Sequence, residues 1–137
     1  SYTNGWRYLE VAPYDQSLGV VWGCYGTNIA NTNYGIGEGF DNSQIILSNC
    51  TSVDIAARIC DTLILNGYSD WHLPSRDEFF LINDNLFNFN VGNFALTNYW
   101  SSTQSGQYHG FSFNFGNSQY YSSYKTELYR VRAIRRF

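Results

Sequence analysis

The alternation of apolar and polar positions near the N-terminus predicts two short strands. Residues 6–11 (WRYLEV) alternate until Pro13, which ends the strand because proline removes a backbone donor. Residues 19–23 (GVVWG) predict a second strand, and residues 25–39, rich in Gly and Asn, predict a long loop with turns.

The same period of two returns in the C-terminal part of the chain. Residues 109–115 alternate Phe with small or polar residues, which predicts a strand with Phe111, Phe113 and Phe115 on one buried face. Gly116-Asn117 predicts a turn and residues 118–122 a returning strand. Residues 129–137 predict one last strand.

Helical periodicity lies between these strands. Residues 40–47 suggest a short helix, and Ser52 is a candidate cap for a clearer one that ends at Asn66-Gly67. Its apolar stripe comprises Ala56, Ile59, Cys60 and Leu63. Ser75 to Glu78 form an S-x-x-E capping box before an apolar run. We therefore expect one α+β domain over residues 1–137, with two helices packed on a small antiparallel sheet and long loops.

Composition excludes several classes of protein. Of 137 residues 19% are aromatic and only 14% charged, a balance that disordered chains do not have. The net charge of −3 argues against a general nucleic-acid binder, and no apolar run is long enough for membrane insertion. The charge is uneven, because residues 1–124 are acidic, residues 125–137 are basic, and residues 85–124 carry no charge.

The three cysteines leave several pairings open. Cys24 and Cys50 lie in polar surroundings and form a disulfide candidate, Cys50–Cys60 competes with it, and no disulfide at all is a third possibility. Cys60 on a helical stripe favours a buried thiol. No C-x-x-C spacing supports a metal site. Ser1 and the absence of Met indicate a fragment or a processed product, so we expect the C-terminal part of a longer protein.

Catalytic chemistry has little support. His72, squeezed between Trp71 and Leu73, is better explained as structural than as a general base, and His109 lies in the uncharged segment. Nucleophile elbows, phosphate loops and calcium loops are absent from the sequence. We expect no catalytic residues, no cofactor and no enzyme.

Two segments favour binding instead. Residues 98–124 have the Tyr, Ser, Gly and Asn content of an antibody paratope, which would suit a sugar or a protein partner equally. The exposed binding face would comprise Tyr108, His109, Asn114, Gln119, Tyr120, Tyr121 and Tyr124.

The basic end offers a second candidate site. Strand alternation would place Arg130, Arg132 and Arg136 on one face, where with Lys125 they could bind sulfate or carboxylate groups. The competing interpretation is that one or two of these arginines form ion pairs with the acidic body.

Five segments together resemble the Legionella collagen-like adhesin C-terminal domain family, which is related to the Fibrobacter succinogenes major paralogous domains. They are residues 5–13 (GWRYLEVAP), 22–27 (WGCYGT), 66–78 (NGYSDWHLPSRDE), 99–103 (YWSST) and 131–137 (VRAIRRF). The resemblance implies a C-type-lectin-like fold on a secreted or bacterial cell-surface protein. It also implies structural roles for His72, Arg132 and Arg135.

The function that the resemblance implies is adhesion without catalysis, through binding of sulfated glycosaminoglycans such as heparin by a homotrimer. The alternative is a protein-recognition module that uses the Tyr-rich face, of the kind diversified by retroelements. A third and weaker hypothesis is an enzyme related to the formylglycine-generating fold, whose chemistry would need reactive cysteines.

Overall fold

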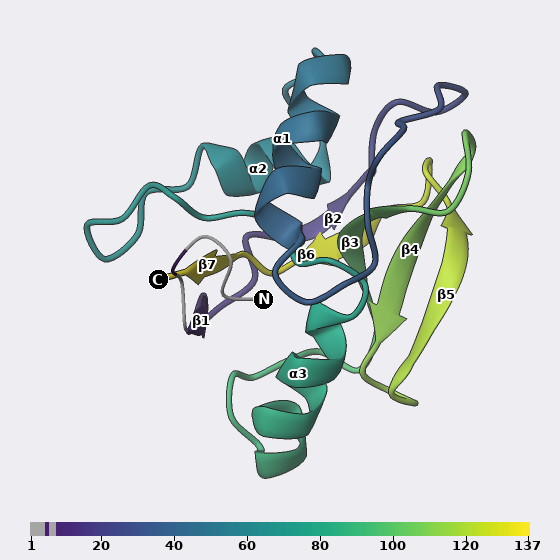
Figure 1. The fold of residues 1–137 in the computed structure, drawn as a ribbon. Coiled ribbons are helices and arrows are strands. Elements are labelled where there is room, and N and C mark those ends of the chain that lie inside the picture. The colour runs from purple at the N-terminus through teal and green to yellow at the C-terminus, as the bar shows by residue number, and fades with distance from the viewer. Residues whose placement is uncertain (1–4, 6–7) are drawn as a thin grey trace.

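The computed structural model describes residue 5 and residues 8–137, and combines three helices with two small sheets (Figure 1). The predicted strand over residues 6–11 lies partly outside this range, at residues 6 and 7. The elements in chain order are β1 (Leu9–Val11), β2 (Ser17–Val20), α1 (Gly39–Asn49), α2 (Ala56–Asp61), α3 (Glu78–Asn85), a 3-10 turn (Phe87–Phe89), β3 (Asn98–Gln104), β4 (His109–Asn114), β5 (Gln119–Tyr124), β6 (Tyr129–Val131) and β7 (Ile134–Arg136).

The larger sheet has the strand order β2-β6-β3-β4-β5, and β1 and β7 form a separate pair. The mixed α+β class agrees with the sequence, but the purely antiparallel sheet does not. Strand β6 inserts between β2 and β3 and runs parallel to β3, with Tyr99 opposite Arg130. Strand β5 forms the open edge on the right of Figure 1, and the β1–β7 pair lies on the other side.

The predicted terminal strand over residues 129–137 is wrong as a single element. The chain leaves the large sheet after Val131 and joins β1 from Ile134, with Arg132 and Ala133 between the two sheets. The Ala133 carbonyl accepts a hydrogen bond from Ala12 N–H at 2.9 Å across this break. Strand parity therefore does not carry from Arg130 to Arg136.

The helices are three rather than two. Helix α1 extends the predicted residues 40–47, whereas α2 has six residues and ends at Asp61. Asn66-Gly67 does not cap α2. Both residues have positive φ in a tight turn, closed by reciprocal backbone hydrogen bonds between Leu65 and Tyr68. Gly67 is in the left-handed region, with φ of 80°, as part of this turn and not as a helix cap.

The capping box before α3 is formed as predicted. Ser75 N–H donates to Glu78 Oε1 at 2.7 Å, and Glu78 N–H donates to Ser75 Oγ at 3.3 Å. Glu78 is fully buried and also accepts a hydrogen bond from Gly37 N–H at 2.9 Å, so the box ties the loop before α1 to the start of α3. Burial raises the pKa of the Glu78 carboxyl.

Two apolar clusters form the core. Trp22, Trp71 and Trp100 pack with α1 and α2 in one, and the other packs α3 against the Phe side of β4. Phe113 and Phe115 are buried as predicted, while Phe111 is half-buried. The turn after Phe115 and the return along β5 follow the predicted hairpin, with six continuous pairs from His109–Tyr124 to Asn114–Gln119.

Candidate ligand-binding site

The basic end was predicted to present Lys125, Arg130, Arg132 and Arg136 as an anion site. The structure instead places Lys125 and Arg132 in the interior. The reason is the break between β6 and β7, together with carboxylates and carbonyls that approach from distant parts of the chain.

Arg132 is the most enclosed of the four. Its Nε donates to Asp15 Oδ1 at 2.9 Å, and its Nη atoms donate to the carbonyls of Ala12, Gly92 and Asn93. Only 1% of the residue is exposed. Every nitrogen of the guanidinium thus has a partner within the protein, and no donor is left for a ligand. Arg132 therefore has the structural role that the resemblance implied.

Arg130 shares the same carboxylate. Its Nη1 lies 2.8 Å from Asp15 Oδ2, and Tyr99 O–H also donates to Asp15, at 2.9 Å. Burial, and then the nearby Asp15 carboxylate, raise the pKa of Tyr99 to about 12. Asp15 is thus the centre of a hydrogen-bond network, and two of the predicted anion-binding arginines bind this carboxylate of the protein itself.

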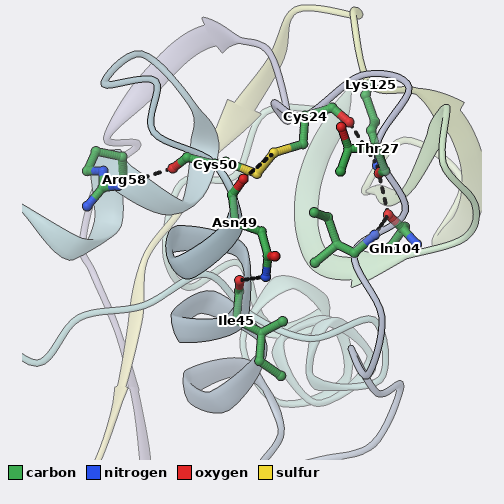
Figure 2. The surroundings of a disulfide bond; sticks show 9 residues. Cys24, Thr27, Ile45, Asn49, Cys50, Arg58, Gln104 and Lys125 are labelled. Atoms are coloured by element: carbon green, nitrogen blue, oxygen red, sulfur yellow. Dashed lines mark hydrogen bonds between the residues drawn. A yellow bond between two sulfur atoms is a disulfide. The ribbon is translucent and has the colours of Figure 1, made fainter.

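Lys125 is a buried cation without a carboxylate partner. Its Nζ donates to Gln104 Oε1 at 2.8 Å, Thr27 O at 3.0 Å and Cys24 O at 3.3 Å, and it lies 4.6 Å from the centre of the Trp22 ring. Figure 2 shows the ammonium beneath the loop that carries Cys24 and Thr27. Burial lowers the pKa of Lys125 to about 8. The residue holds this loop and is not accessible to a polysaccharide.

The same loop is anchored by a disulfide between Cys24 and Cys50, one of the pairings that the sequence left open (Figure 2). Cys60 is a buried free thiol on α2, and burial raises its pKa far above the ordinary range. Such a thiol is unreactive at neutral pH.

The arginines of β7 are also engaged. Arg136 Nη1 donates to Gly37 O at 3.3 Å, with its guanidinium 4.6 Å from the Phe40 ring centre. Arg135 pairs with Asp70 at 2.8 Å and Glu10 at 3.0 Å. The hydrogen bonds from Arg135 lower the pKa of Asp70. The positive charge that residues 125–137 carry is therefore largely neutralised or enclosed.

The predicted Tyr-rich face divides between the two sides of the sheet. Cross-strand partners share a side, so His109, Tyr124 and Tyr120 lie on the side of Phe111 and Phe113. Asn114, Gln119 and Tyr121 lie on the other side, together with Ser112, which is buried. Tyr108 precedes β4, and its ring contacts the tilted ring of Tyr25, with centres 5.0 Å apart. The seven residues therefore do not form one surface.

One side of the hairpin does gather exposed rings. The His109 and Tyr124 rings are 4.4 Å apart, and Phe111 is in edge contact with both Tyr34 and Tyr120. We call this set the aromatic surface; it comprises Tyr34, His109, Phe111, Tyr120 and Tyr124. Tyr34, Tyr120 and Tyr124 are 48%, 37% and 53% exposed, so the rings are available to a ligand.

Arg76, which no sequence pattern marked as a binding residue, lies against this surface. The Arg76 guanidinium carbon lies 4.1 Å from the centre of the Tyr34 ring and 4.4 Å from that of Tyr120. Arg76 is one of the two unspecified residues in the S-x-x-E capping box, and that pattern indicates only the start of a helix. Its neighbours come from a loop and from β5, so no local signal could have identified it.

Tyr34 is held next to Arg76 by backbone contacts. Its carbonyl accepts a hydrogen bond from Asp77 N–H at 2.9 Å, and Ser75 Oγ donates to Gly35 O at 2.7 Å. The Arg76 N–H donates to Thr103 Oγ1 at 3.0 Å. The loop, the start of α3 and β3 thus fix the aromatic surface in place.

The two histidines lie in different surroundings, His72 in the interior and His109 on β4 beside Tyr124. His72 is buried against Phe40, and its Nδ1 lies 3.3 Å from Asp70 O. Burial lowers the pKa of His72 to about 4, so it is neutral near pH 7. Within residue 5 and residues 8–137, no three His, Cys, Asp or Glu side chains are grouped as metal ligands require. None of the helices in this part of the chain has the length and apolar character needed to span a membrane.

A family model for the Lcl C-terminal domain matches residues 13–135, which includes every element from β2 to β6 and most of β7. The chain belongs to the Lcl C-terminal domain family. Membership assigns it to a domain type of the Legionella collagen-like surface protein, in agreement with the resemblance found in the sequence. A search of curated proteins found no match.

Two tryptophans of this Lcl C-terminal domain are fixed in the core by hydrogen bonds from their indole rings. Trp22 and Trp100 donate their indole N–H groups to Ser101 O and Val20 O at 2.7 and 2.8 Å. A phenylalanine at either position would leave a buried carbonyl without its donor.

Proposed function

We propose that the chain is a non-catalytic adhesin domain of a secreted or cell-surface protein, with a C-type-lectin-like fold, and that it binds sulfated polysaccharides such as heparin. Membership of the Lcl C-terminal domain family supports the surface role. The observation that carries the binding proposal is the aromatic surface on β4 and β5, which combines exposed rings with the Arg76 guanidinium.

The chemistry of that surface suits a sugar. Tyr presents a large, rigid and amphipathic area at low entropic cost, so its ring face packs on a sugar ring while its hydroxyl hydrogen-bonds. His109 adds a ring nitrogen beside Tyr124. Because residues 85–124 carry no charge, β4 and β5 contribute no acidic group that would repel an anionic chain.

A homotrimer would strengthen such binding. One surface with one guanidinium makes few contacts, but three copies on a single polysaccharide convert later contacts into intramolecular ones. Avidity of this kind raises affinity by ~100-fold or more without new contacts. We propose the trimer on this ground and on the resemblance. Light scattering gives the mass and tests it directly.

The decisive experiment replaces Tyr124 and Tyr120 with Ala and measures retention on heparin. Tyr14, equally exposed at 53% and outside the aromatic surface, provides the matched control Tyr14→Ala. We expect the surface variants to bind about tenfold more weakly, and the control to bind as the wild type. Equal retention of all three variants would contradict the proposed site.

A protein-recognition module is the second candidate, and the edge strand favours it. Gln119, Tyr120, Tyr121 and Ser122 are exposed in succession on β5, whose outer edge pairs with no strand among the described residues. An uncharged edge of this kind is a site where a partner strand can add. A variant Ser122→Pro would block strand addition and leave heparin retention unchanged.

A further inference from the structure

Arg76 differs from the other arginines that the structure describes. Arg58, Arg130, Arg132, Arg135 and Arg136 each use at least one Nη atom in a hydrogen bond or ion pair within the protein. Arg76 uses only Nε, which donates to Asp77 Oδ1 at 3.0 Å. Its Nη1 and Nη2 form no hydrogen bond with any described residue, and neither is a fully buried atom. The four Nη N–H donors therefore have no partner among the described residues, and the side chain that carries them is 19% exposed.

The position of these donors is fixed. The guanidinium carbon lies 4.1 Å from the Tyr34 ring centre, 4.4 Å from that of Tyr120 and 5.3 Å from that of Phe111. Contact with these rings restricts the guanidinium, and its Nε donates to the Asp77 carboxylate. A ligand that approaches the Nη1–Nη2 edge meets donors that are already ordered, which lowers the entropic cost of binding.

We propose that the Nη1–Nη2 edge of Arg76 binds two oxygens of an anionic group on a sugar, either a carboxylate or a sulfate ester. The proposal deepens the proposed function and rests on it, because it assigns the charged contact of the aromatic surface. A paired N–H···O contact to an oxyanion is the strong, geometrically specific mode of arginine. The flanking Tyr34 and Tyr120 rings would contact the sugar that carries the group.

The Asp77 carboxylate makes a specific prediction. It lies on the same guanidinium and offsets part of its charge, so each single contact is modest in strength. Removal of that negative charge should therefore favour an incoming anion. We expect Asp77→Asn to bind anionic saccharides about two- to threefold more tightly, whereas Arg76→Gln weakens binding about tenfold. Opposite effects from adjacent residues cannot arise from a general loss of folding.

The test uses calorimetry with the whole chain and four polysaccharides. Heparin carries both groups, hyaluronan only carboxylates, dextran sulfate only sulfate esters, and dextran neither. Arg76→Lys keeps the positive charge but lacks the paired Nη donors of the guanidinium, and should also bind more weakly. Arg58→Gln makes the same charge change away from the aromatic surface, and should bind as the wild type. Dextran affinity should not differ between variants.

The outcomes separate the site from the function. Weaker binding of Arg76→Gln to hyaluronan assigns a carboxylate, and weaker binding to dextran sulfate assigns a sulfate. If the wild type binds heparin and Arg76→Gln binds every anionic probe equally well, the site is wrong and the proposed function stands. If the wild type binds no polysaccharide, the proposed function is wrong. In that case glucuronate and sulfate are titrated into the protein while the NMR resonance of the Arg76 Nε–H is followed. An unchanged resonance would overturn the proposed site.

Discussion

The basic end and the aromatic surface use arginine in opposite ways. In the basic end, Arg132 directs its donors to Asp15 and to three backbone carbonyls, and the cation serves to join distant segments. In the aromatic surface, Arg76 directs only Nε to a carboxylate, that of Asp77, and its other contacts are with rings, which accept no strong hydrogen bond, so its Nη donors stay free. The availability of a cation to a ligand thus depends on what stabilises it and not on how many cations lie nearby.

The largest effect should come from Arg132. Arg132→Met leaves Asp15 short of a partner and three carbonyls without a donor, and loss of one member of a buried pair costs about 3–5 kcal/mol. We expect the free energy of unfolding, measured by urea denaturation, to fall by that amount. Unchanged stability with weaker heparin retention would show that Arg132 binds the ligand. It would contradict the contrast between the basic end and the aromatic surface.

Lys125→Met should have the next largest effect. Three acceptors lose a charged donor, and hydrogen bonds to charged groups contribute about 1.5–3 kcal/mol. The loop that carries Cys24 should loosen, which hydrogen exchange of the Thr27 and Ile29 amides would report. Exchange rates equal to the wild type would show that the ammonium does not hold the loop.

The pH dependence gives an independent check on Lys125. Its pKa is about 8 in the folded protein and 10.5 ordinarily, so the unfolded chain binds more protons between these values. The contribution of Lys125 to the free energy of unfolding should therefore rise from pH 8 toward 10.5. The measurement is the difference between wild type and Lys125→Met across that range, and a flat difference would contradict it.

Arg136 should matter less. Arg136 is half-buried, donates one hydrogen bond to Gly37 O and lies against the Phe40 ring. Contacts of this kind at a partly exposed residue contribute about 0.5–1 kcal/mol. We expect Arg136→Gln to lower the free energy of unfolding by no more than this, and to elute from heparin with the wild type. Earlier elution would show that Arg136 contributes to an anion site at the basic end.

The smallest effect on stability should come from Tyr124. Its ring is 53% exposed and stacks only on His109, so Tyr124→Ala should change the free energy of unfolding by less than about 0.5 kcal/mol. Polysaccharide affinity should fall nonetheless. A variant that loses binding but not stability sharpens the contrast with Arg132, where the opposite is expected.

Local patterns predicted the elements whose cause is local. The Ser75–Glu78 box and the β4–β5 hairpin depend on residues a few positions apart, and both formed as expected. The prediction of an anion site at the basic end was wrong because Arg130 and Arg132 bind Asp15, which lies more than a hundred positions away in the sequence. Alternation along residues 129–137 does not show that the chain changes sheets at Arg132 and Ala133.

The aromatic surface shows the same limit. The Tyr content of residues 98–124 correctly indicated exposed rings, but the division of those rings depends on the pairing of β4 with β5. Tyr34 and Arg76 come from other segments, and no spacing in the sequence connects them. Family resemblance supplied the structural role of Arg132, which periodicity alone could not.

The pairing of β1 with β7 has a mechanical consequence. Leu9 lies opposite Arg136, so the chain enters and leaves the domain at one pole, while β5 forms the other flank in Figure 1. A tether joined at either end would pull on two adjacent antiparallel strands, whose hydrogen bonds tie the ends to each other. If the proposed ligand on the β4–β5 hairpin opposes such a pull, the load passes from the β1–β7 pair and the Asp15 network beside it across the domain to that hairpin.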